Sequence, residues 1–220
     1  MINGELLTFF EDLKQNNNRE WFEPRKKTYK ALKAEFEAFM DDVAGHVAEV
    51  DPAIDLVLEH PKTIKVYRIY RDVRFSKDKS PFKTNIGGLI SAGEGQPTYY
   101  LHVEPGNSFA GGGFYMPTGS LLKALRQKIE DEHDALEALL ADEAFAAVFP
   151  DGLSVMGDEL KTAPRGYAKD HHAIAWLRKK HFIVTRALSD DELVDEGFEA
   201  QLAQIFEQLS RFNMALSVDE

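Results

Sequence analysis

The chain has 220 residues, 44% of them hydrophobic and 29% charged, with a formal net charge of −11 and a pI near 5.1. This composition is typical of a globular protein and excludes a disordered chain. The acidic balance argues against a protein that coats nucleic acid or an anionic membrane over a broad surface. There is no cysteine, which excludes disulfides, thiolate catalysis and cysteine-ligated metal centres. A cytoplasmic location fits these features.

No apolar stretch approaches the roughly 20 residues that span a bilayer, so no membrane partner is predicted. The first 15 residues carry acidic residues inside their apolar run and have no basic start, unlike a signal peptide. The sequence leaves the oligomeric state undetermined.

Helical spacing of apolar residues predicts a short first helix that buries Leu6, Phe10 and Leu13. Asparagines 16–18 suit both the end of that helix and the start of the next one. A long helix is predicted over residues 24–50, because Pro24 fits a first helical turn and Asp51 precedes a proline.

Period-two alternation then predicts strands at 64–71, 85–91, 98–104 and 108–115, the last bent or bulged at glycines 111–113. Their short connections favour an antiparallel meander. Helical spacing returns around 121–129, 136–140 and 145–149, and again from near Asp170. A strand at 182–188 precedes a capping box, Ser189 to Glu192, that opens the last helix.

These elements predict a single α+β domain over residues 1–220. Its central, mainly antiparallel sheet would have about five strands, flanked by N-terminal and C-terminal helices.

The most informative segment is 62–83, which carries eight basic and two acidic residues. Its charge of +6 leaves −17 for the rest of the chain, so the segment is expected to hold an anion or to pair with acidic neighbours. We predict that it binds a phosphate-bearing or carboxylate-bearing ligand. The predicted ligand-binding residues are Arg71, Arg74, Lys79 and Lys83, with Arg68, Arg165 and Arg19 assisting.

The acid–base candidates are Asp72 and Asp78 in this segment and His102 on the third strand. Tyr100, His102 and Glu104 share one strand face, which suits either proton transfer over a bound anion or a merely solvated sheet face. Arg68 shares a face with apolar residues, so we expect it to pair with an acid such as Glu104 or to bind a ligand.

Several motifs also resemble a known family. They are the N-terminal pattern F-x-x-L-x-x-N-N-x-R-x-W-F, the run R-D-V-R-F-S-K-D-K-S-P-F-K-T at 71–84, Y-Y-L-H-V-E-P at 99–105, G-G-G-F-Y at 111–115, and P-R-G-Y with a later Asp-His. Over nearly its whole length the chain resembles a family of unknown function that is widespread in bacteria and also found in fungi. The resemblance implies no established activity, cofactor or catalytic residue.

Other candidate sites have less support in the sequence. The glycines at 111–113 lack the lysine of a phosphate-binding P-loop, and His171 and His172 lack the spacing of a known metal motif. The sequence therefore identifies no metal site and no cofactor.

Two functional hypotheses remain, together with a structural one. The first is a binding protein for an anionic small molecule or nucleotide, acting as a hydrolase or transferase if it is an enzyme. The alternative is a non-catalytic module whose basic loop grips nucleic-acid phosphates locally, or an acidic protein partner. In the structural hypothesis, the loop's charges pair only with the protein's own acids.

Overall fold

A computed structural model of the chain describes residues 1–154 and 159–218. Over those residues, the helices are α1 (Gly4–Gln15), α2 (Arg19–Val50), α3 (Pro52–Asp55), α4 (Gly119–Ala141), α5 (Glu143–Val148), α6 (Ile174–Leu177), α7 (Asp190–Val194) and α8 (Phe198–Leu216). The strands are β1 (Ile64–Val66), β2 (Ile86–Ser91), β3 (Thr98–Val103), β4 (Ser108–Phe114) and β5 (Phe182–Leu188).

The strands form one five-stranded sheet in the order β1-β2-β3-β4-β5, and every neighbouring pair is antiparallel. The predicted α+β fold, with helices from both ends of the chain flanking an antiparallel sheet, is confirmed. Between β4 and β5 the chain makes a long excursion through α4, α5 and α6 before it returns to the sheet edge.

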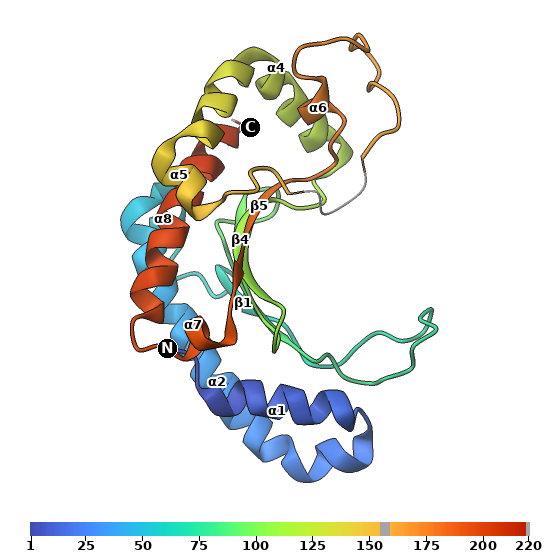
Figure 1. Ribbon diagram of the computed structural model, residues 1–220, viewed down its shortest axis with the longest axis vertical. Coiled ribbons are helices and arrows are strands. Elements are labelled where there is room, and N and C mark those ends of the chain that lie inside the picture. The colour runs from blue at the N-terminus through green and yellow to red at the C-terminus, as the bar shows by residue number, and fades with distance from the viewer. Residues whose placement is uncertain (155–158, 219–220) are drawn as a thin grey trace.

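One face of the sheet carries the main core. Figure 1 shows the sheet nearly edge-on, with α2 and α8 packed on its convex side and none of the described helices covering the concave side. Tyr99, Leu101 and Val103 of β3 point toward the helices and are fully buried. Because strand residues alternate between faces, Tyr100 and His102 must point to the concave side.

The second helix begins five residues earlier than predicted, at Arg19, so Pro24 lies inside it rather than in its first turn. Asn18 is the reason, because its side chain accepts a hydrogen bond from the Trp21 amide (2.9 Å) and caps the helix. A proline one turn further on then leaves only one intrahelical bond unmade.

The C-terminal half also departs from prediction. The helices expected at 121–129 and 136–140 are one element, α4, kinked at Glu132. The helix expected from Asp170 is a single turn that starts at Ile174. The Ser189–Glu192 capping box is confirmed, but α7 ends at Val194 and α8 is a separate helix, because Asp195 adopts an extended backbone.

No bulge interrupts β4. Its register with β3 and β5 is continuous through Gly111 and Gly112. The glycines instead allow the β4 backbone to lie close to its neighbours, since a Cβ at Gly112 would lie 1.9 Å from the carbonyl oxygen of Thr98.

The first strand is shorter than predicted and ends at Val66. Beyond it the chain stays extended and pairs with residues further on: Tyr70 forms an isolated bridge to Phe82, and the Lys83 amide bonds the Ile69 carbonyl (2.7 Å). Residues 71–80 therefore form a loop, called the basic loop below, that projects from the base of the sheet and is drawn in teal in Figure 1.

Candidate functional site: the concave face of the sheet

A cavity of about 500 Å³ lies on the concave face. Side chains from β3 and β4 form its floor, and a residue after the basic loop reaches its rim. Tyr100, His102, Glu104, Phe109 and Lys83 are among the residues that line it. The side chains of His102 and Glu104 are only 14% and 19% exposed. The face is thus a sheltered hollow, and its polar groups are partly desolvated.

Tyr100, His102 and Glu104 form a hydrogen-bonded chain along this floor. The Tyr100 hydroxyl lies 3.2 Å from His102 Nδ1, and His102 Nε2 lies 3.4 Å from Glu104 Oε2. Burial lowers the pKa of His102, although Glu104 acts in the opposite direction. A neutral imidazole with its proton on Nε2 satisfies both contacts, because it donates to Glu104 and accepts from Tyr100.

Glu104 is fixed by further donors. Thr84 Oγ1 donates to Glu104 Oε1 (2.9 Å), and Asn107 Nδ2 donates to Oε2 (3.0 Å). Burial raises the pKa of Glu104, but hydrogen bonds from Asn107, Thr84 and His102 together leave that pKa below its ordinary value. The carboxylate is therefore ionised and oriented toward the imidazole.

Lys83 supplies the positive charge at this cavity. Its Nζ lies 5.3 Å from the centroid of the Tyr67 ring, a cation–π distance. Burial and the nearby Arg68 guanidinium lower the pKa of Lys83. A partly desolvated cation of this kind interacts more strongly with an anion than a fully hydrated one does.

Several aromatic rings line the cavity. The rings of His102 and Phe109 stack at 4.8 Å between centroids, and Tyr67 meets Tyr100 edge to face at 6.3 Å. Burial raises the pKa of Tyr100 to about 12, so its phenol stays protonated at neutral pH. These surfaces suit the flat body of a ligand whose charged end lies at Lys83.

Two of the predicted ligand-binding arginines, Arg71 and Arg74, do not line this cavity. Arg71 pairs with Asp78 and also donates to the Ser80 carbonyl (3.2 Å). Arg74 Nη2 bonds Asp72 Oδ2 (2.6 Å) and is 77% exposed. These internal pairs, which do not reach the Lys83 cavity, are what the structural hypothesis predicts for Arg71 and Arg74.

The two acids of the loop, Asp72 and Asp78, are likewise hydrogen-bonded within it. Hydrogen bonds from Ser80 and then Arg71 hold the pKa of Asp78 well below its usual range, and Arg74 lowers that of Asp72. Neither acid lines the cavity. Lys79 donates to the Val73 carbonyl (2.9 Å) within the loop. Of the three acid–base candidates, the structure brings only His102 into the hollow.

The other predicted ligand-binding residues lie elsewhere. Arg19 is the exposed first residue of α2, and Arg165 is exposed on the loop before α6. Arg68 is exposed rather than buried among apolar residues, and Glu104, its expected partner, is bonded to Thr84, Asn107 and His102 instead. Arg68 nevertheless lies close enough to lower the pKa of Lys83.

Several residues that line the cavity were not singled out from the sequence, Tyr67, Asn107 and Phe109 among them. Tyr67 was detectable by alternation, since it falls on the face of its strand opposite Val66. Asn107 follows β3 in the turn to β4, where only the folded turn shows that its amide reaches Glu104.

The histidines before α6 join another cluster. His171 stacks on His172 (4.5 Å), which meets His133 of α4 edge to face (5.1 Å). Within residues 1–154 and 159–218, no group of three or more histidine, cysteine or acidic side chains has a geometry that would hold a metal ion.

The fold and the hollow define a class: an α+β protein whose antiparallel sheet is covered by helices on one face and carries a polar and aromatic cavity on the other. A family model described as "Conserved hypothetical protein (DUF2461)" matches residues 5–214, and the chain belongs to that family. No curated protein and no solved structure matches the chain. In the described part of the chain, no helix has the length and apolar character needed to cross a bilayer.

Proposed function

We propose that the concave face binds a small molecule that carries a phosphate or carboxylate group, with a nucleotide as the best-fitting class. The observation that carries the proposal is the position of Lys83 at a partly buried cavity whose floor is the Tyr100–His102–Glu104 chain. Lys83 would neutralise the anion, and the aromatic walls would contact the flat part of the ligand.

The chemistry that these groups support is hydrolysis or group transfer at the bound anion. Neutral His102 would accept a proton from a water molecule as that water attacks the phosphoryl or acyl centre of the ligand. The imidazolium that forms, stabilised by Glu104, would return the proton to the leaving oxygen as its bond to that centre breaks. Lys83 would stabilise negative charge that develops on the phosphoryl or acyl oxygens. A cytoplasmic site of action, compatible with the absence of cysteine, is part of this proposal.

One observation favours the alternative function, a non-catalytic module that docks through the basic loop. Phe75, within this projecting loop, is 96% exposed, and Arg74 lies beside its ring (5.9 Å). An exposed ring among cations suits contact with a base or with an acidic partner. The internal pairing of Arg71 and Arg74 weighs against it, because those charges are already partly neutralised.

Thermal-shift measurements on the purified chain distinguish the two. We expect stabilisation by some members of a panel of nucleotides, sugar phosphates and dicarboxylates, because a ligand that binds only the folded state raises Tm. The shift should vanish in Lys83→Ala and persist in the matched control Lys77→Ala, whose lysine lies in the loop outside the cavity. Loss of the shift in Lys77→Ala alone would instead support docking through the loop.

Catalysis is tested separately. For any ligand that the wild type binds and converts, product formation should be lost in His102→Gln while the ligand-induced Tm shift remains. A ligand that binds but is never turned over would leave the binding proposal standing and remove the catalytic one.

A further inference from the structure

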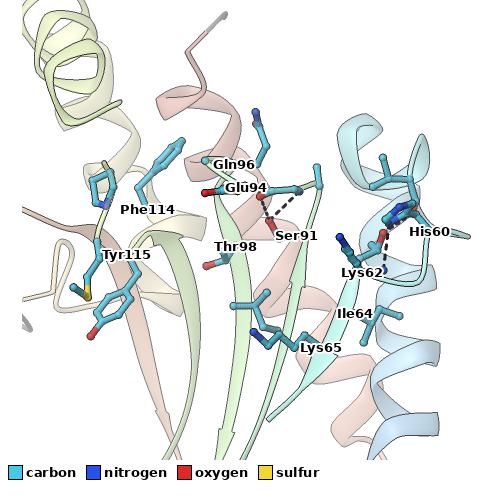
Figure 2. A pocket seen from close by; sticks show the side chains of 18 of the residues that line it. His60, Lys62, Ile64, Lys65, Ser91, Glu94, Gln96, Thr98, Phe114 and Tyr115 are labelled. Atoms are coloured by element: carbon cyan, nitrogen blue, oxygen red, sulfur yellow. Dashed lines mark hydrogen bonds between the residues drawn. The ribbon is translucent and has the colours of Figure 1, made fainter. Parts of the chain in front are cut away.

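A second cavity, of about 800 Å³, opens beside the first one. The segment after α3, the turn after β2 and the chain after β4 surround it, and Figure 2 shows His60, Lys65 and Tyr115 among the residues that line it. Leu89, Thr98 and Tyr115 line both cavities. The two hollows are therefore parts of one groove across the concave face.

Lysines are distributed along this groove. Lys65 Nζ lies 5.0 Å from the centroid of the Tyr67 ring, and Lys83 Nζ lies 5.3 Å from the same centroid. Lys65 lines the second cavity together with Lys62, whereas Lys83 lines the first. Positive charge thus occurs in both halves of the groove, and the two cations have the Tyr67 ring as a common neighbour.

These lysines differ from the arginines of the basic loop. Among the described residues, Lys62 and Lys65 take part in no ion pair, whereas Arg71 and Arg74 each have a carboxylate partner. The charges of Lys62 and Lys65 are therefore available to an external anion.

An aromatic surface is also available where the cavities meet. Tyr115 is 61% exposed, and its ring stacks on His181 at 4.9 Å between centroids. His181 is held in turn, because its Nδ1 accepts a hydrogen bond from the Met116 amide (2.9 Å). A ring supported on one face and exposed at a groove is a suitable platform for a planar group.

We propose that the groove binds a short single-stranded segment of nucleic acid, of more than one nucleotide. This inference rests on the proposed function and extends its ligand from a mononucleotide to a chain. Phosphates would contact Lys83, Lys65 and Lys62 in turn, and bases would stack on Tyr115 and the neighbouring rings, the combination that characterises single-strand binding. An acidic peptide would use the lysines but has no bases for the rings.

Fluorescence anisotropy with labelled oligo-dT and oligo-U of two, four and eight nucleotides tests this, with unlabelled mononucleotide as competitor. Affinity should rise from the mononucleotide to the tetranucleotide. The double variant Lys62→Ala/Lys65→Ala should lose that rise and keep mononucleotide binding. The control Lys27→Ala/Lys30→Ala removes two exposed lysines of α2 that line neither cavity, and it should match the wild type.

Salt dependence supplies a second readout. Each phosphate neutralised on a single strand contributes about −0.7 to the slope of log K against log salt concentration. Three lysine contacts predict a slope of about −2, and the Lys62/Lys65 double variant should lose about two-thirds of it. Tyr115→Leu should weaken tetranucleotide binding at least about fivefold, while Tyr115→Phe should retain it.

Each alternative outcome would refute a specific part of this proposal. Equal affinity for mononucleotide and tetranucleotide would refute the extended ligand and leave the small-molecule proposal intact. Equal binding of a hexa-aspartate peptide, unaffected by Tyr115→Leu, would point to an acidic protein partner. If no oligonucleotide binds, the inference fails, and the thermal-shift panel decides whether the first cavity binds an anion at all.

Discussion

The side chain of Asn17 pairs with both backbone groups of Phe82, a residue 65 positions later. Asn17 Nδ2 donates to the Phe82 carbonyl (3.0 Å), and the Phe82 amide donates to Asn17 Oδ1 (3.1 Å). The Phe82 ring also stacks on Phe22 of α2 at 4.2 Å between centroids. The junction between α1 and α2 therefore holds the end of the basic loop, and through it the backbone next to Lys83.

Asn17→Ala should destabilise the protein by about 2 kcal/mol, because Phe82 is buried and both its backbone groups would lose their partner. Urea unfolding measures the change, and limited proteolysis should show faster cleavage within 71–80. The matched control is Asn16→Ala, whose exposed amide bonds only the Asp12 carbonyl (3.0 Å) and should cost less than about 0.5 kcal/mol. Equal effects of the two substitutions would contradict this role of Asn17.

Gly87→Ala should displace the Tyr100 side chain without unfolding the sheet. A Cβ at Gly87 would lie 2.3 Å from the Tyr100 hydroxyl, so the ring must move and its contact with His102 must break. The expected result is loss of ligand binding or turnover with a modest fall in Tm. Gly119→Ala is the control, since a Cβ there meets nothing within 4 Å. Unaltered ligand affinity and turnover in Gly87→Ala would show that the position of Tyr100 is irrelevant.

The titration of His102 reports on the cavity. Because its folded-state pKa lies below the unfolded value near 6.5, the unfolded chain binds more protons between the two values. Stability contributed by His102 is therefore lost as pH falls from about 6.5 through the folded pKa. His102→Gln should flatten the pH dependence of stability in that window relative to wild type. An identical pH dependence of wild type and variant would contradict it.

Neighbouring charges should shift that titration in defined directions, as followed by NMR of the imidazole. Glu104→Gln should lower the pKa of His102 further, because the carboxylate raises it, and Lys83→Met should raise it. A bound anion should also raise it. Absence of all three shifts would place the imidazole outside the electrostatic reach of the cavity.

Tyr99→Phe should destabilise the protein by about 1–3 kcal/mol. The Tyr99 hydroxyl donates to Asp51 Oδ2 (2.6 Å), and Asp51 is only 6% exposed. The other oxygen of Asp51 caps α3 through the Ala53 amide (2.9 Å), so the buried carboxylate loses one of its donors. Tyr70→Phe, at a ring that is 44% exposed, is the control, and thermal unfolding of both variants is the measurement.

The sheet was predictable because alternation is local. Tyr99, Leu101 and Val103 are apolar at every second position, which fixes their shared burial and places Tyr100, His102 and Glu104 together on the other face. Helix ends were predictable where capping chemistry lies in adjacent residues, as at Ser189. The start of α2 was missed because Asn17 and Asn18 are alike in sequence, and only Asn18 caps the helix.

The site was only partly predictable, because charge composition does not specify partners. The sequence showed the excess of cations at 62–83, but the Asp72–Arg74 and Asp78–Arg71 pairs depend on the conformation of the folded loop. The roles of Asn17 and Asn107 are set by contacts made in the folded chain. Lys83 belongs to the cavity because the chain after the loop returns beside Ile69, which no local pattern indicates.

We propose that ligand charge settles in the cavity on the concave face and not on the projecting loop. NMR chemical-shift mapping of the isotope-labelled full chain, during titration with a nucleoside monophosphate that stabilises it, tests this placement. Signals of His102, Thr98 and Lys83 should shift together while those of Lys77 stay fixed. Shifts confined to residues 72–80, with the His102 imidazole unchanged, would contradict it.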